Sequence, residues 1–253
     1  IMQTYDGWAD KDKTDFKKWI VDVFAAKNIE FMKGHGGQCS DHYWSNWDLV
    51  NMCSYMAIGI LTENDDMVNY VVNYFYNGVG NGYIGKLIQG TFTDPLGSGE
   101  EIAQNQESGR DQTHAQLGLG MMSMLCETAW KQGTDLYGVL DNRLPKGYEY
   151  TAKYNLGYDV PFKYMPELTG KYNWYEIDEV DKKEVASGQR PESRRGKFAP
   201  VYERVYNHYA TRLGLGMPYV KEVLETKVRP ENAGTDIAHL GYGTFLYCSE
   251  GFE

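Results

Sequence analysis

The feature that most constrains this chain is a series of apolar segments with helical spacing, several of them closed by glycine. The first, from Asp15 to about Met32, repeats apolar residues close to the 3.6-residue period of an α-helix. Strand signals are few, although Gly241 to Leu246 is expected to be extended. The same reasoning predicts loops over residues 78–109 and 161–196, and helices over residues 46–61, 65–77, 109–132, 136–155, 200–214 and 218–226.

Successive helices joined by long irregular loops predict an all-α protein built of helical hairpins stacked in a ring, an (α/α) toroid. We treat residues 1–253 as a single domain. A complete toroid has more helices than this chain predicts, so we expect an incomplete barrel. One explanation is that the N-terminal part of the barrel is missing, because the chain opens at Ile1 with no signal-peptide pattern.

The composition of the chain argues against two classes of protein, nucleic-acid binders and proteins with a membrane helix. A net charge of −10 disfavours a general nucleic-acid binder, and no apolar run approaches the roughly 18 residues of a membrane helix. The chain holds 21 tyrosines and 6 tryptophans. Amphipathic rings of this kind suit either a sugar-binding cleft or a tyrosine-rich helical core, and composition does not choose between them.

A dense polar run spans residues 104–114 at the mouth of an apolar helix. On a helix Glu107, Arg110 and His114 stand at i, i+3 and i+7, and therefore share one face. Three functional groups beside an apolar stretch indicate a site at the rim of the core. The alternative is a capped helix with a solvated first turn.

Two further segments carry candidate residues. In residues 41–48, Trp44 and Trp47 flank Asn46, which either caps a helix or offers its amide to a substrate. His35 lies in a glycine-rich segment expected to be a flexible loop.

In residues 194–209, the basic pair Arg194 and Arg195 precedes a stripe of Tyr202, Tyr206 and Tyr209. Such a stripe is typical of core packing, but a neighbouring cation would lower the pKa of a tyrosine as base chemistry requires.

Three segments carry a family resemblance: residues 45–49 (SNWDL), 106–114 (QESGRDQTH) and 148–157 (YEYTAKYNLG). They resemble the alginate lyase superfamily of polysaccharide lyases, and within it polysaccharide lyase family 38, which includes glucuronan and alginate lyases. The resemblance implies an (α/α) toroid that needs no metal or other cofactor. It implies cleavage of an anionic uronate polysaccharide by β-elimination, in the periplasm or after secretion.

The resemblance also implies roles. The related alginate lyase family five uses an Asn-His pair, an Arg and a Tyr. Asn46 matches the Asn, Trp47 stands where the His would be, Arg110 matches the Arg, and His114 falls where the Tyr would be. His114 is then either the base, with a tyrosine as the acid, or a group that neutralises the substrate carboxylate.

Tyr202, with Arg195 nearby in sequence, is our choice for the missing tyrosine. The full set of predicted catalytic residues is Asn46, Arg110, His114 and Tyr202. The predicted lining of the substrate cleft is Trp44, Trp47, Glu107, Tyr154, Trp174, Arg194, Arg195 and Tyr206. Tyr206 and Tyr154 are further candidates for the acid or base.

Two other functions fit the same residues. A glycoside hydrolase needs two carboxylates flanking the bond; Glu107 offers one, and the sequence shows no convincing second. A non-catalytic polysaccharide-binding protein would keep the aromatic and arginine residues and tolerate loss of His114 and Tyr202.

Overall fold

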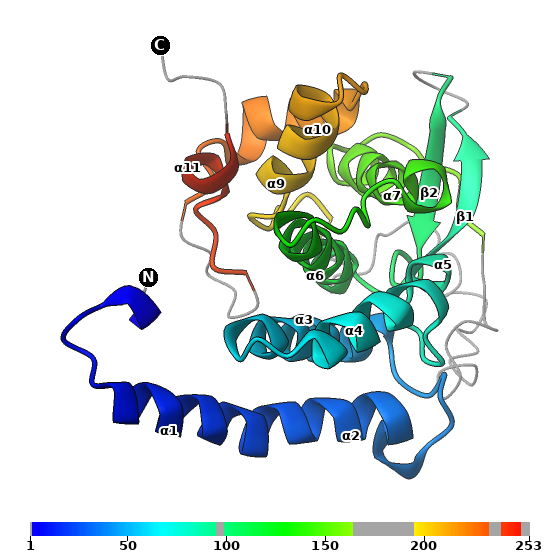
Figure 1. The fold of residues 1–253 in the computed structure, drawn as a ribbon. Coiled ribbons are helices and arrows are strands. Elements are labelled where there is room, and N and C mark those ends of the chain that lie inside the picture. The colour runs from blue at the N-terminus through cyan, green and yellow to red at the C-terminus, as the bar shows by residue number, and fades with distance from the viewer. Residues whose placement is uncertain (1, 95–98, 164–194, 233–238, 249–253) are drawn as a thin grey trace.

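The computed structural model describes residues 2–94, 99–163, 195–232 and 239–248. It is mainly helical (Figure 1). A long N-terminal helix is formed by α1 (Asp10–Ile20), a π-helical turn and α2 (Ala26–Gly34). It packs against α3 (Ser45–Leu61), which pairs with α4 (Asp65–Asn77). This confirms the prediction of a mostly helical chain.

The predicted loop after α4 instead contains a β-hairpin. A short α5 (Ile84–Leu87) leads into β1 (Ile88–Thr93), which pairs antiparallel with β2 (Glu101–Asn105). β1 alternates poorly between apolar and polar residues, so periodicity does not reveal it. The hairpin packs on α7 (Val139–Asn155), and this contact buries the apolar residues of β2.

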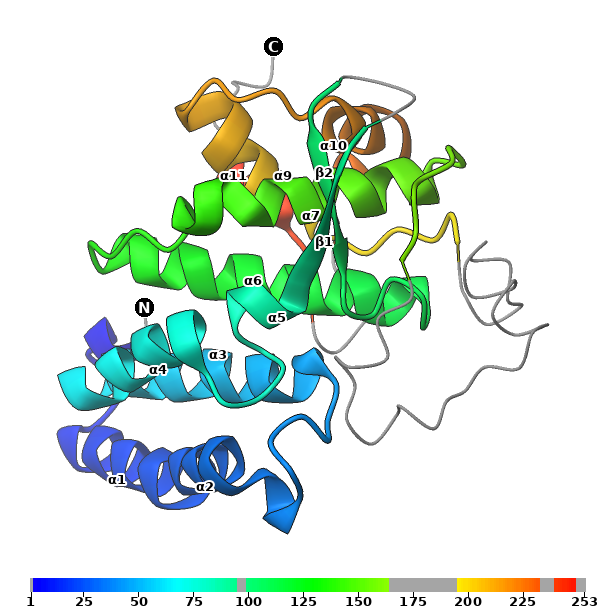
Figure 2. The same cartoon turned by 90° about the vertical axis from the view of Figure 1, so that its right-hand side faces the viewer.

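The centre of the molecule is α6 (Gln112–Lys131), which lies between α3 and α7 (Figure 2). Its other neighbour is α9 (Tyr202–Tyr206), which continues in a π-helical segment to Arg212. Gly120 permits this approach, because a Cβ there would lie 2.7 Å from Val201 and 2.4 Å from His239. Gly120 therefore marks a close approach of other chain segments to α6.

The C-terminal part adds α10 (Pro218–Val223) and α11 (Gly243–Tyr247). The expectation of an extended segment at Gly241–Leu246 is wrong over most of its length, because α11 occupies it. In the described ranges, no helix is long and apolar enough to cross a membrane. Closure of the helices into a toroid stays a prediction.

Candidate active site

The turn between β2 and α6 carries the polar run predicted as a site. Asn105 Oδ1 accepts a hydrogen bond of 2.8 Å from the Glu107 amide, and Ser108 Oγ lies 3.1 Å from the Asn105 amide. Asp111 caps α6, because its Oδ1 accepts a 2.8 Å bond from the His114 amide. The turn is therefore held in one shape, and α6 begins three residues later than the sequence predicts.

Glu107 and Arg110 form one pair within this turn. Arg110 Nη1 donates to Glu107 Oε2 over 2.8 Å, and the Ser45 hydroxyl lies 3.2 Å from the other carboxylate oxygen. Glu107 is only 1% exposed, and burial raises the pKa of its carboxyl, against the effects of Arg110 and His114. The Arg110 guanidinium also stacks on the Trp44 ring at 5.2 Å. Arg110 is thus held between a carboxylate and an indole.

Asp111 and His114 form a second pair beside the first. His114 Nδ1 lies 2.6 Å from Asp111 Oδ2, and the histidine side chain is one-third exposed. Burial alone would raise the pKa of Asp111, but the hydrogen bonds and charge of His114, together with Arg110, lower it. A carboxylate on Nδ1 leaves Nε2 as the working nitrogen of the ring. In the described part of the chain, no protein group pairs with Nε2.

The start of α3 is tied to the same turn. The Ser45 amide donates to Gln106 Oε1 over 2.9 Å, and this contact brings the segment carrying Trp44 alongside Arg110. Asn46 follows as the second residue of α3, so it is not the helix cap. Within the described residues its carboxamide makes no hydrogen bond, to Arg110 or to any other group.

An aromatic cluster of Phe31, Tyr43 and Trp47 also lies at this helix start. The Trp47 ring centroid is 5.0 Å from that of Tyr43 and 5.9 Å from that of Phe31, nearly parallel to it. Trp47 is 47% exposed. It therefore presents an open ring face of the kind that packs against a sugar.

Tyr202 does not have the surroundings that the sequence suggested. It is fully buried, its hydroxyl donates to Gln116 Oε1 over 2.9 Å, and burial raises its pKa well above the usual range. Arg195 instead donates to the carbonyl oxygens of Tyr154 and Tyr158, at 2.9 and 3.0 Å. The expectation that Arg195 lowers the pKa of Tyr202 is therefore wrong.

The remaining predicted residues divide into three cases. Tyr154 lies under Arg195, whose guanidinium is 4.2 Å from its ring centre; burial raises the pKa of Tyr154 and Arg195 opposes that rise. Tyr206 is partly buried against the core. Trp174 and Arg194 lie outside the described residues.

Sequence reasoning missed a buried network beneath the start of α3. Asp48 Oδ1 lies 3.0 Å from His35 Nε2 and 3.2 Å from the Tyr74 hydroxyl, while its Oδ2 accepts from the Gly82 amide at 2.8 Å. His35 is therefore a buried residue, and its assignment to a flexible loop is wrong. The clue was Gly80 and Gly82, because a Cβ at either would lie within 2.3 Å of Asp48.

A second polar network was also missed. Gln112 Oε1 accepts from Asn155 Nδ2 over 2.8 Å, and Gln116 bonds to Lys197 and Ala199 over 2.8 and 2.9 Å. These contacts hold the start of α6 against the end of α7 and the segment that leads into α9. Two glutamines four residues apart on an otherwise apolar face were the available signal.

The hydrogen bonds of these two pairs favour proton transfer by His114 over hydrolysis by two carboxylates. Glu107 is buried with both oxygens hydrogen bonded, and Asp111 is committed to His114 and the helix cap. Neither carboxylate is free to flank a glycosidic bond as hydrolysis requires. A histidine with an open Nε2 beside an arginine suits proton transfer next to an anionic group.

Comparison with known proteins agrees with this arrangement. The alginate lyase family model matches residues 1–159, a segment that includes both pairs and Trp44 but ends before Arg195. No curated protein and no solved structure matches the chain. Because the matched segment covers well over half of the sequence, the chain belongs to the alginate lyase family and is a polysaccharide lyase.

Proposed function

We propose that the substrate is a β-1,4-linked uronate polymer, glucuronan or alginate, and that it is cleaved by β-elimination with His114 in proton transfer. The observation that carries this proposal is the Asp111–His114 pair, joined over 2.6 Å at the rim that also holds Arg110. A polymeric substrate favours action in the periplasm or after secretion.

The chemistry requires a positive or donating group at the substrate carboxylate. The C5 proton of a uronate is weakly acidic because it lies α to that carboxylate, and its removal places a second negative charge on the same group. Donors at the carboxylate make this intermediate accessible. We assign this part to Arg110 and to the unpaired carboxamide of Asn46.

Proton transfer falls to His114 and a tyrosine. With Nδ1 bonded to Asp111, the neutral ring has its lone pair on Nε2 and can accept the C5 proton. The leaving O4 then needs a proton. Tyr202 is fully buried, so we propose Tyr154 as the donor: it is 7% exposed, and its neighbour Asn155 is hydrogen bonded to Gln112 at the start of α6. Burial raises the pKa of Tyr154 further above neutral pH, so the phenol carries the proton that O4 needs.

The test is the ultraviolet absorbance of the C4–C5 double bond that elimination leaves in the product. Wild-type protein is incubated with glucuronan, polymannuronate and polyguluronate in turn, and the polymer that gives a signal identifies the substrate. His114→Ala should reduce the rate by about 10²- to 10⁴-fold. His42→Ala is the control, because it removes the same kind of side chain, an imidazole ring that contacts Tyr43 and lies outside the Asp111–His114 pair. Reducing ends without new absorbance would show hydrolysis and overturn the proposal.

Asp111→Asn separates the orientation of His114 from the helix cap. Asparagine caps helices about as well as aspartate does, so stability should change little. The histidine loses its charged partner, as in the triad enzymes where an Asp→Asn change selects the wrong tautomer. We expect the rate to fall by about tenfold or more. An unchanged rate would show that Asp111 only caps α6.

A further inference from the structure

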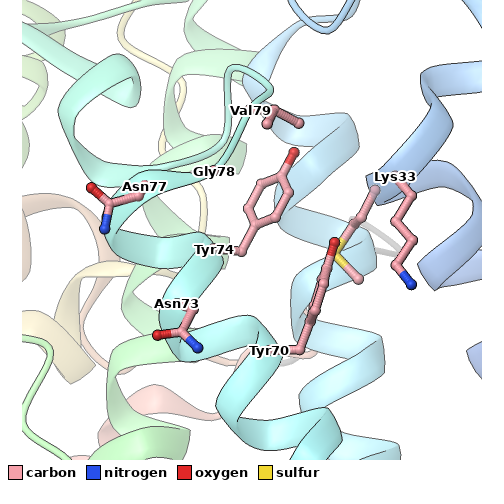
Figure 3. Close-up of a pocket in the computed structure, with 8 residues that line it drawn as sticks. Lys33, Tyr70, Asn73, Tyr74, Asn77, Gly78 and Val79 are labelled. Atoms are coloured by element: carbon pink, nitrogen blue, oxygen red, sulfur yellow. The ribbon is translucent and has the colours of Figure 1, made fainter.

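A cavity of about 540 Å³ lies between α2 and α4, apart from the Arg110–His114 site (Figure 3). It is lined by Met32, Lys33, Tyr70, Asn73, Tyr74, Asn77, Gly78 and Val79. The side chains of Lys33, Tyr70 and Tyr74 lie around the gap between the helices, while Asn73 and Asn77 lie along α4. Its volume falls in the range of pockets that hold small ligands.

Apart from the Tyr74 hydroxyl, the polar side chains of this cavity make no hydrogen bonds to the described part of the protein. Within the described residues, no hydrogen bond or ion pair engages Lys33, the Tyr70 hydroxyl, or the carboxamides of Asn73 and Asn77. Lys33 Nζ lies 5.9 Å from the centre of the Tyr70 ring. Lys33 and Tyr70 therefore offer polar groups to a ligand in the gap, and Asn73 and Asn77 offer theirs farther along α4.

The charge of the cavity differs from that of the whole protein. Lys33 is the single charged residue of the lining, in a chain with a net charge of −10. Asp48 lies beneath Tyr74, but both of its oxygens are engaged by His35, Tyr74 and Gly82. Lys33 therefore supplies one accessible positive charge that can pair with an anionic group of a ligand.

The floor of the cavity is held rigidly. The Tyr74 hydroxyl donates to Asp48 and accepts a 3.1 Å bond from the Gly80 amide. Tyr70 packs between Tyr74 and Tyr55, with ring centroids 6.2 and 6.0 Å apart. A preorganised surface binds a ligand with little loss of side-chain entropy.

We propose that this cavity is a second binding site for the polymer, taking an acidic sugar unit away from the catalytic residues. Lys33 pairs with the uronate carboxylate, Asn73 and Asn77 bond to hydroxyls, and the Tyr70 ring packs on the C–H face of the sugar. The site would hold a long chain on the enzyme between cleavages. It rests on the proposed function for the identity of its ligand.

The test is retardation of the protein in native gels that contain glucuronan or alginate, against gels that contain neutral dextran. Lys33→Gln should weaken retention by about two- to fivefold, as loss of an exposed charge pair does. Asn73→Asp adds a negative charge at an exposed position and should weaken it further. Lys27→Gln is the matched control; it makes the same charge change on α2, and Lys27 is paired with Glu30 outside the cavity.

A second readout separates the two proposals. Cleavage of short oligouronates should be unchanged in Lys33→Gln, because they occupy only the Arg110–His114 site. Equal retention of Lys33→Gln and Lys27→Gln, or no retention in any uronate gel, would overturn the second site. Absence of unsaturated products with every polymer would overturn the proposed function, whereas retention that depends on Lys33 would still support the second site.

Discussion

Tyr202→Phe tests whether Tyr202 is the acid or base that the sequence predicted or the buried core residue that the structure shows. The change removes one hydroxyl, which donates to Gln116 Oε1 over 2.9 Å inside the core. The ring keeps its edge contacts with Tyr148 and Phe198, at centroid distances of 5.8 and 6.1 Å. Gln116 Oε1 stays satisfied, because it also accepts a 2.9 Å bond from the Ala199 amide.

The expected loss of stability is that of one neutral hydrogen bond whose removal leaves no buried polar group unpaired. Such a bond contributes about 0.5–1.5 kcal/mol to stability. In a chain of this length, a loss of about 1 kcal/mol lowers the Tm by about 2–4 °C. Removing a true acid or base would instead cost about 10²- to 10⁴-fold in rate. The two outcomes therefore differ by at least two orders of magnitude in kcat.

Thermal unfolding and the ultraviolet lyase assay, run on the same preparation, measure both quantities. Tyr209→Phe is a matched control, because Tyr209 is equally buried and donates to the Tyr137 carbonyl over 2.7 Å. We expect both variants to retain kcat within a few-fold. A folded Tyr202→Phe protein with a hundredfold loss of kcat, beside an active Tyr209→Phe, would refute the exclusion of Tyr202.

Two further predictions concern the buried polar groups. Gly80→Ala places a Cβ 2.1 Å from Asp48 Oδ2 and should lower the free energy of unfolding by about 1–3 kcal/mol in urea titrations; Gly34→Ala, with no atom within 4 Å of its Cβ, should not. Burial raises the pKa of Glu231 from 4.5 to about 7, so its contribution to stability is complete below about pH 4.5 and is lost as the pH rises through 7. Glu231→Gln cannot ionise and should flatten the pH dependence of stability between these values by about 3 kcal/mol; a profile parallel to that of wild type would contradict this.

How much the sequence could predict is clearest at the start of α6. Glu107, Arg110 and His114 do lie together as predicted, but the predicted reason is wrong, because Glu107 and Arg110 belong to the turn before α6 and do not share a helix face with His114. The partner of each side chain in this group was less predictable. Asp111, which is absent from the predicted set, binds His114 and caps the helix. Local spacing shows which residues are near one another, but it does not show which atoms pair.

Burial is where prediction failed most. A stripe of Tyr202, Tyr206 and Tyr209 looks the same in a sequence whether it faces a cleft or a core, because the helical period does not say what packs against it. Tyr202 is buried against Tyr148 of α7 and Gln116 of α6, which come from segments distant in the sequence. His35 was misjudged for the same reason, because its partner Asp48 lies on a different helix.

The sequence by itself determined the mainly helical content, the polar turn before α6 and membership of the alginate lyase family, because these depend on residues close together in the chain. The tertiary structure decided the β-hairpin, the burial of Tyr202, the Asp48 network and the cavity beside Lys33. Each of these depends on contacts between segments distant in sequence, whose desolvation and packing outweigh local preference.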